Sequence, residues 1–262
     1  MAVLTQHAPG TFCWPELTTL DQIQAKQFYG ALFGWTYRDI PMGPDAGVYT
    51  IFQKNGQDCA ALTQMSQPMR AQGTPPHWGS YVAVVSVDES TKRAESLGAK
   101  IVMQPFDVMT AGRMSVIQDP SGAVVSLWQG KDTIGVTILE EPGALAWTEL
   151  LTMGTDKARD FYTRLFNWKL AEMNMGPLTY TIFKRPDGTQ AAGMMPAPPE
   201  MQMPPAWLSY IQVENCDATV AKSKELGGRV FVGPQDVPGV GRFSVMADSQ
   251  GAMFGAYQPE KR

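Results

Sequence analysis

Two matching pairs of tryptophan and glutamate are the residues of this chain whose types and spacing could do chemistry. Trp14 and Glu16 stand two positions apart in the first half, and Trp147 and Glu149 repeat the pattern in the second half. Side chains two apart in a strand point to the same face, so each indole and carboxylate would lie together. A carboxylate among aromatic side chains is costly to keep ionised, so its pKa rises. A raised pKa would suit a general base that removes a proton beside a carbonyl group.

Two other roles for the glutamates remain open. Each could contact a bound ligand, since the neighbouring indole could hold a cation or stack against a flat ring. Each could instead be a structural anchor, hydrogen-bonded to a neighbouring backbone amide or to Arg113 or Arg242. The presence of Glu16 and Glu149 in both halves favours an inherited structural role, because both copies of an active site need not survive a duplication.

Composition limits the class of protein. A chain of 262 residues suits two domains of about 125 residues each. No apolar run approaches the ~20 residues of a membrane span, and the N-terminus lacks a secretory pattern. The net charge of −4, with both signs scattered, argues against a nucleic-acid partner. Three cysteines in no pattern indicate free thiols in a reducing compartment, so we expect a cytoplasmic protein. We expect it to be either a monomer or a homodimer.

The rest of the chain is repeated as well, and the repeat predicts the elements that position the two pairs. After each Trp-x-Glu strand we expect a helix, capped by Asp21 in the first half and opened by Thr155 or Asp156 in the second. Gly34 and Asn167 suit the left-handed residue at the end of these helices. Three strands follow each helix, so the pattern is β-α-β-β-β.

The same pattern begins again in each half after a connector rich in proline and methionine. Prolines at that density predict extended connectors over residues 65–76 and 194–205. The second helices are expected over Asp88–Leu97 and Asp217–Leu226. The chain should therefore hold two domains, 8–130 and 142–260, and the centre of the segment between them, 134–139, could pair with a sheet.

This organisation resembles the vicinal oxygen chelate superfamily, which includes glyoxalase I, extradiol dioxygenases and bleomycin-resistance proteins. The start of each half, Pro-Gly-x-x-x-Trp-x-Glu-Leu, is similar to that of two-domain glyoxalase-like proteins of bacteria. The Phe-Tyr pair in the first helix and the Asp-Pro-x-Gly turn from Asp119 to Gly122 also fit. The resemblance implies an α+β fold of four βαβββ modules, paired into two tandem half-open barrels whose mouths hold the ligand. It specifies a fold and not a reaction.

The resemblance also implies where a metal would be bound. In the metal-dependent members, His and Glu side chains from the first and last strands of the modules are the ligands. The six matching positions hold residues that are not divalent-metal ligands of the expected kind: Trp14, Trp147, Gly79, Leu208, Ser126 and Gly255. Of the two histidines, only His77 could be a ligand, and a solvated residue at a strand entrance is the plainer interpretation. We expect no cofactor; a divalent metal is left open but is not supported by the ligand positions.

Strand alternation within the implied barrels selects the lining side chains. In the first half they are Trp14, Glu16, Thr18, Gly79, Tyr81, Ala83, Ser126 and Trp128. In the second half they are Trp147, Glu149, Leu151, Leu208, Tyr210, Gln212, Gly255 and Tyr257. The aromatic members of both sets are the expected ligand contacts, and Glu16 and Glu149 are the candidate catalytic residues. Arg113 and Arg242 either clamp an anionic group or, the favoured interpretation, pair with a nearby acid at the sheet rim.

An aromatic cavity with few polar groups suits a small hydrophobic or cationic molecule. We therefore expect a glyoxalase/bleomycin-resistance-like protein that binds such a ligand, without the usual metal site. The alternative is a lyase, isomerase or dioxygenase-related enzyme acting on a small carbonyl or aromatic substrate, with Glu16 or Glu149 as the general base. A third hypothesis is an interaction module whose barrels support a surface. Motifs for dinucleotides, phosphate loops or a serine nucleophile are absent from the sequence.

Overall fold

The computed structural model describes residues 3–43, 47–175, 178–198 and 203–260. The first half forms an eight-stranded sheet in the order β2-β3-β4-β1-β5-β8-β7-β6, which we call barrel 1. Its strands are β1 (Phe12–Thr19), β2 (Thr36–Pro41), β3 (Val48–Lys54), β4 (Gln57–Gln64), β5 (His77–Ala83), β6 (Lys100–Val108), β7 (Gly112–Gln118) and β8 (Val124–Gly130). Its helices are α1 (Gln22–Phe33), α2 (Gln67–Ala71) and α3 (Val87–Ser96).

The second half repeats this sheet as β10-β11-β12-β9-β13-β16-β15-β14, which we call barrel 2. Its strands are β9 (Leu145–Leu151), β10 (Lys169–Met175), β11 (Leu178–Lys184), β12 (Gln190–Met195), β13 (Ala206–Gln212), β14 (Arg229–Val237), β15 (Gly241–Ala247) and β16 (Met253–Pro259). Its helices are α4 (Thr155–Phe166) and α5 (Cys216–Glu225). The predicted α+β fold of four βαβββ modules is confirmed.

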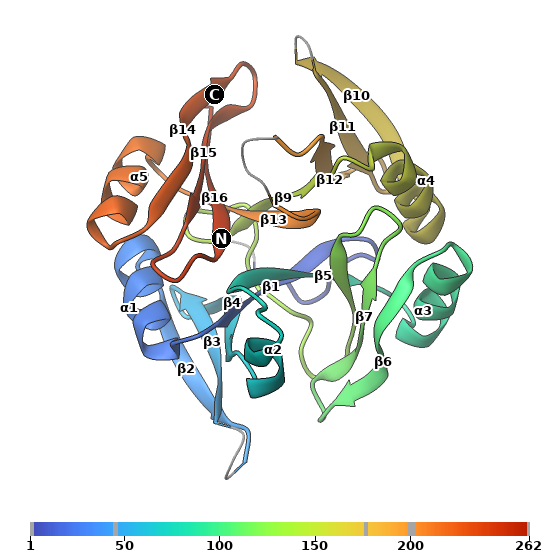
Figure 1. The fold of residues 1–262 in the computed structure, drawn as a ribbon, viewed down its shortest axis with the longest axis horizontal. Coiled ribbons are helices and arrows are strands. Elements are labelled where there is room, and N and C mark those ends of the chain that lie inside the picture. The colour runs from blue at the N-terminus through green and yellow to red at the C-terminus, as the bar shows by residue number, and fades with distance from the viewer. Residues whose placement is uncertain (1–2, 44–46, 176–177, 199–202, 261–262) are drawn as a thin grey trace.

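The central strands of each sheet join its two modules. In barrel 1, β1 pairs antiparallel with β5, and each of them also pairs in parallel with the last strand of its own module, β4 or β8. The second half has the same pairing around β9 and β13. This arrangement places the Trp-x-Glu strands, β1 and β9, at the middle of the curved sheets (Figure 1).

The helix ends follow the sequence signals. The Asp21 side chain accepts hydrogen bonds from the backbone amides of Ile23 and Gln24, and so caps α1. Helix α4 begins at Thr155, after Gly154. Gly34 and Asn167 adopt left-handed conformations with φ of 67° and 56°, as the sequence predicted.

The first connector differs from its prediction. It was expected to be extended, but it contains α2, whose first turn includes Pro68. Proline is tolerated there because the first amide groups of a helix have no intrahelical acceptor. The described parts of the second connector, 196–198 and 203–205, are irregular, and residues 199–202 lie outside the described residues.

The segment between the two halves runs beside barrel 1 without forming a strand. The Val136 amide donates to the Cys13 carbonyl oxygen and the Thr137 amide donates to the Asp58 carbonyl oxygen, both at 2.8 Å. The predicted pairing of this segment with a sheet is therefore limited to isolated backbone hydrogen bonds.

The two halves pack against each other through the outer sides of their sheets, with α1 beside α5 and α3 beside α4 (Figure 1). One core cluster joins Phe28 and Tyr29 of α1 to Phe254 of β16. The Tyr29 hydroxyl donates to Asp248 Oδ2 at 2.9 Å and accepts from the Trp78 indole nitrogen at 3.0 Å. Hydrogen bonds between Asp21 and Gln250 and between Ser80 and Ser209 also cross this seam, so polar as well as apolar contacts join the halves.

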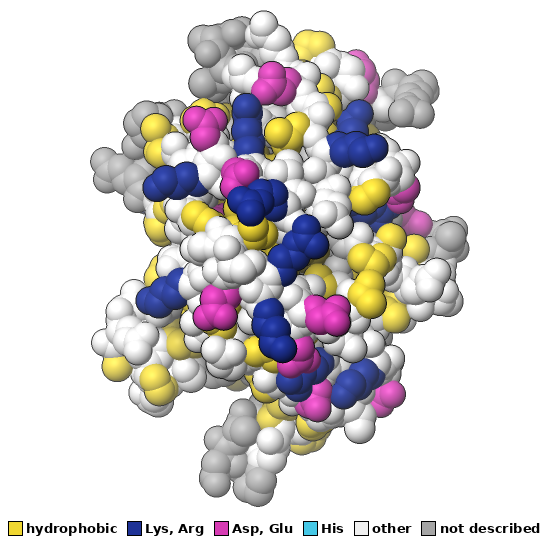
Figure 2. Space-filling view, turned by 90° about the vertical axis from the view of Figure 1, so that its right-hand side faces the viewer, with side chains coloured by type: hydrophobic (Ala, Val, Ile, Leu, Met, Phe, Trp, Pro, Cys, Tyr) yellow, Lys and Arg dark blue, Asp and Glu magenta, His cyan; other side chains and the backbone are white. Residues whose placement is uncertain are grey.

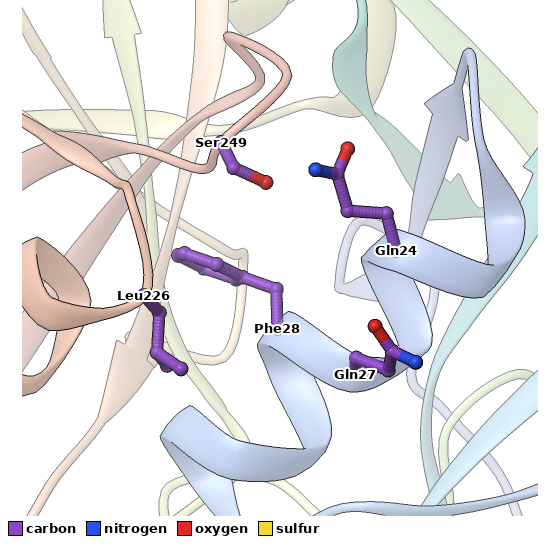
Figure 3. A pocket seen from close by; sticks show the side chains of 5 residues that line it. All are labelled: Gln24, Gln27, Phe28, Leu226 and Ser249. Atoms are coloured by element: carbon purple, nitrogen blue, oxygen red, sulfur yellow. The ribbon is translucent and has the colours of Figure 1, made fainter.

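Two pockets lie on the outside of α1 rather than inside the barrels. One, of about 200 Å³, lies at the seam between the halves, where Phe28 points toward Leu226 and Ser249 (Figure 3). The other, of about 520 Å³, lies between α1 and β2 and includes Lys26 and Tyr37 in its lining.

Charged side chains of both signs are interspersed on the face of the molecule shown in Figure 2, as their scatter along the sequence suggests. Among the helices of the described residues, none combines the length and the apolar character that crossing a membrane requires.

Candidate functional site

The floor of barrel 1 holds a hydrogen-bonded cluster around Glu16. The Tyr49 hydroxyl of β3 donates to Glu16 Oε2 at 2.5 Å, and the Tyr81 hydroxyl of β5 donates to Oε1 at 3.1 Å. The Trp14 indole nitrogen donates to the Tyr49 hydroxyl at 3.0 Å. Residues from three strands therefore hold the carboxyl group in one orientation.

Barrel 2 repeats this cluster around Glu149. The Tyr210 hydroxyl donates to Glu149 Oε2 at 3.0 Å, and Tyr180 also forms a hydrogen bond with this carboxyl group. The Trp147 indole nitrogen donates to the Tyr180 hydroxyl at 2.8 Å. Both copies of the glutamate thus have tyrosine partners, where the sequence suggested a backbone amide or an arginine for a structural anchor.

The remaining predicted lining residues surround these clusters. Trp14, Tyr81, Ala83 and Trp128 belong to one apolar cluster inside barrel 1. Trp147, Leu151, Leu208, Tyr210 and Tyr257 belong to the corresponding cluster of barrel 2. Trp14 is buried within its cluster, and Trp147 is partly buried against the cluster of barrel 2.

The aromatic surroundings shift the acid–base properties of both carboxyl groups. Burial raises the pKa of Glu16, while hydrogen bonds from Tyr49, Tyr81 and Trp14 and the nearby His77 act in the opposite direction. Burial also raises the pKa of Glu149, against hydrogen bonds from its two tyrosines. In both cases burial is the larger effect, as expected for a carboxylate in apolar surroundings. Each carboxyl group therefore holds a proton more readily than an exposed glutamate does.

The arginines predicted near the barrels have other partners. Arg113 forms a bidentate pair with Asp88 at 2.7 and 2.9 Å and lies 3.4 Å from Asp107. Arg242 pairs in the same way with Asp217 and also with Asp236. The pair of Arg113 and Asp88 joins β7 to α3, and the pair of Arg242 and Asp217 joins β15 to α5. Both agree with the favoured interpretation, in which each arginine pairs with a nearby acid at the rim of the sheet.

The two histidines do not converge on one site. His7 Nε2 lies 2.8 Å from the Val136 carbonyl oxygen, and burial lowers its pKa. His77 is partly exposed at the start of β5, with Nδ1 2.9 Å from the Pro75 carbonyl oxygen. Within the described part of the chain, no group of three or more His, Cys, Asp or Glu side chains could hold a metal ion. The donor set on the barrel floors, one carboxylate with phenol and indole groups, does not fit a divalent metal.

Sequence reasoning missed Tyr49 and Tyr180, which complete the two clusters. A signal was present, because the motif Tyr-Thr-Ile-Phe occurs at residues 49–52 and again at 180–183. Strand alternation from the Trp-x-Glu strands could not assign these tyrosines to the inner face, because the register between β1 and β3 is set through β4.

Comparison with known proteins agrees with the fold and its duplication. The family model for the Glyoxalase/Bleomycin resistance protein/Dioxygenase superfamily matches residues 12–127 and again 144–255. Over 256 residues the chain is 40% identical to the "Putative glyoxylase CFP32" of Mycobacterium tuberculosis, which covers 97% of each chain. It is 35% identical to the anthracycline biosynthesis protein DnrV of Streptomyces peucetius, over 96% of this chain and 94% of that protein.

Solved structures with similar folds share little sequence with the chain. The Mn(II)-bound glyoxalase from Novosphingobium aromaticivorans superposes with a TM-score of 0.65 at 15% identity, over 95% of this chain and 82% of the other. A catechol 2,3-dioxygenase superposes with a TM-score of 0.62 at 10% identity, over 98% and 96% of the two chains. Both family-model matches together span most of the sequence, and the chain therefore belongs to the Glyoxalase/Bleomycin resistance protein/Dioxygenase superfamily.

Proposed function

We propose that this protein binds a small hydrophobic or cationic molecule on the aromatic floor of a barrel, and that it does so without a metal ion. The observation that carries the proposal is the carboxyl group of Glu16, held by Tyr49 and Tyr81 among aromatic side chains. Each carboxylate oxygen has two acceptor positions, so the two tyrosine bonds leave capacity for a ligand. The surrounding rings offer faces for a cation or a flat ring.

The metal-free part of the proposal rests on the chemistry of the floor. Phenol and indole groups are not the donors that zinc, nickel or iron select in proteins. The names of the relatives, a glyoxylase and anthracycline biosynthesis proteins, favour a small organic molecule over a macromolecule as the ligand. We also propose a cytoplasmic location, since Cys13, Cys59 and Cys216 are free thiols.

The test is a titration of intrinsic tryptophan fluorescence with aromatic and cationic compounds, alongside metal analysis of the purified protein. We expect saturable quenching, with metal far below one equivalent. Glu16→Gln should change the affinity without lowering the melting temperature, because an amide fills the same volume and its burial carries no charge. Glu95→Gln, on the exposed face of α3, is the matched control. Stoichiometric transition metal, or a large fall in melting temperature of Glu16→Gln with unaltered binding, would refute the proposal.

A second candidate function is proton abstraction from a carbonyl compound by Glu16. The raised pKa of this carboxyl group favours it, because a general base works best with a pKa near the working pH. The test is deuterium exchange at the carbon beside the carbonyl of dihydroxyacetone, followed by proton NMR. The exchange should be catalysed by the wild type and absent in Glu16→Gln.

A further inference from the structure

The two barrels have equivalent glutamates on their floors, but the residues beside these glutamates differ. On the neighbouring central strand, Gly79 stands opposite Glu16, whereas Leu208 stands opposite Glu149. Leu208 is 3% exposed and belongs to the apolar cluster of barrel 2. One barrel therefore leaves the side of its glutamate open, and the other closes it with a leucine.

The next inward position repeats this difference. Two residues after the glutamate, barrel 1 has Thr18 and barrel 2 has Leu151. Leu151 is 2% exposed and belongs to the apolar cluster of barrel 2. The second connector adds Ala197 and Met203 to that cluster. The equivalent connector of barrel 1 forms α2, which contributes no residue to the barrel 1 cluster of the described residues.

The two glutamates differ in exposure in the sense that these differences in their neighbours predict. Glu149 is 6% exposed, whereas Glu16 is partly exposed, although both are surrounded by aromatic side chains. The residues on either side of Glu16, Pro15 and Leu17, are buried, and its carboxyl group lies with Tyr81 on the inner side of the sheet. Of the two glutamates, the one in barrel 1 therefore keeps the larger exposed surface.

We propose that barrel 1 is the ligand-binding half, in which Glu16 accepts a hydrogen bond from an N–H or O–H group of the ligand, and that barrel 2 is a closed structural copy. This inference rests on the proposed function and narrows its ligand class. The ligand has a flat apolar body that lies against the aromatic side chains, and it carries a hydrogen-bond donor, cationic or neutral, at one edge. Gly79 is the residue that keeps the floor open.

Gly79 can be replaced without backbone strain. A Cβ atom built there would have the Glu16 carbonyl oxygen as its nearest neighbour, at 3.6 Å, which is an ordinary contact. A leucine at this position would reproduce the cover that Leu208 gives to barrel 2. Gly79→Leu and Leu208→Ala therefore form a matched pair, one closing barrel 1 and the other opening barrel 2.

The first experiment needs no knowledge of the ligand. The protein is treated with a water-soluble carbodiimide and glycine ethyl ester, and amidation of each glutamate is followed by peptide mass spectrometry. We expect Glu16 to react about tenfold faster than Glu149, which corresponds to a protection of ~1.4 kcal/mol. Gly79→Leu should slow the reaction of Glu16 to that of Glu149, and Leu208→Ala should accelerate the reaction of Glu149. Equal rates for the two glutamates in the wild type would overturn the inference.

The second experiment is calorimetric titration with 9-aminoacridine, a flat cation with N–H donors, and with anthracene-9-carboxylate as a flat anion. We expect one site per chain for the cation, an affinity reduced about tenfold or more by Gly79→Leu, and no change in Leu208→Ala. Two equivalent sites, or a loss of binding in Leu208→Ala alone, would overturn the assignment of barrel 1 while leaving the proposed function intact. If neither probe binds, the result counts against the proposed function. The amidation rates still decide which barrel is open.

Circular dichroism and urea unfolding of both variants check that they fold. If Gly79→Leu does not fold, Gly79→Ala supplies a smaller cover at the same position. It should slow amidation of Glu16 to an intermediate rate, and an unchanged rate in a folded Gly79→Ala protein would contradict the role given to this glycine.

Discussion

The Tyr49 hydroxyl accepts a hydrogen bond from the Trp14 indole nitrogen and donates one to Glu16 Oε2. Such a chain of hydrogen bonds orients all three side chains, because each bond polarises the next. It explains why tryptophan and glutamate recur together two positions apart: a tyrosine from β3, two strands away in the sheet, connects them. Trp147, Tyr180 and Glu149 form the same unit in barrel 2.

Tyr49→Phe tests this unit. The substitution removes a donor to Glu16 and the acceptor of the Trp14 indole, so we expect the free energy of unfolding to fall by about 1–3 kcal/mol. The pKa of Glu16 should rise further, because the hydrogen bond from Tyr49 lowers it in the wild type. Urea unfolding and an NMR titration of ¹³C-labelled glutamate give the two values. Tyr37→Phe, at a half-exposed ring on β2, is the control; a Glu16 titration unaltered by Tyr49→Phe would contradict the prediction.

Glu149→Gln tests the effect of burial on stability against pH. Burial raises the pKa of Glu149 in the folded protein, so the folded state binds a proton at higher pH than the unfolded state does. The contribution of this group to stability is therefore fully present below its ordinary pKa and is lost as the pH rises through the raised value. Glutamine has no such loss, so the variant should gain stability relative to the wild type as the pH rises above about 4.3, the ordinary pKa of a glutamate.

Scanning calorimetry of both proteins at a series of pH values measures the difference for Glu149→Gln. The other titrating groups remain in both proteins, so the difference isolates Glu149. A difference that does not change with pH would show that the folded and unfolded pKa values of Glu149 are equal.

Tyr29→Phe tests the link between the two halves. Without the hydroxyl, Asp248 loses a donor and the Trp78 indole loses its acceptor at a buried seam. We expect a loss of about 1–3 kcal/mol in the free energy of unfolding, measured in urea. Tyr162→Phe at the matching position should have a similar effect, because the Trp207 indole donates to its hydroxyl at 2.9 Å. Losses below a few tenths of a kcal/mol in both variants would mean that these two hydroxyl groups do not stabilise the seam.

The sequence predicted the modules and the inner face of the central strands because both depend on local repetition and on strand alternation. Asp21, Gly34 and Asn167 marked helix ends through purely local chemistry. The sequence did not reveal the role of Asp248, which accepts a hydrogen bond from Tyr29 across the seam. A repeat states that two halves are alike and carries no information on which of their faces meet.

The same limit applies to the candidate site. Trp14 and Glu16 were found because they share one strand, whereas Tyr49 reaches Glu16 from β3, two strands away in the sheet. The short helix α2 was missed for another reason. The density of prolines in the connector indicated an extended chain, but Pro68 lies in the first turn, where the missing amide costs nothing.

Gly255→Ala tests whether barrel 2 is built for packing. A Cβ atom at Gly255 would lie 2.1 Å from Cδ1 of Tyr210, so the ring must move and weaken its hydrogen bond to Glu149. We expect a loss of about 1–3 kcal/mol in the free energy of unfolding, as for other overpacked cores. Gly79→Ala, whose new methyl group meets only an ordinary contact, should change stability far less. If barrel 1 holds the ligand, Gly255→Ala should leave the affinity for 9-aminoacridine unchanged in calorimetric titration while lowering stability. A loss of affinity for 9-aminoacridine in Gly255→Ala would place the ligand in barrel 2 instead.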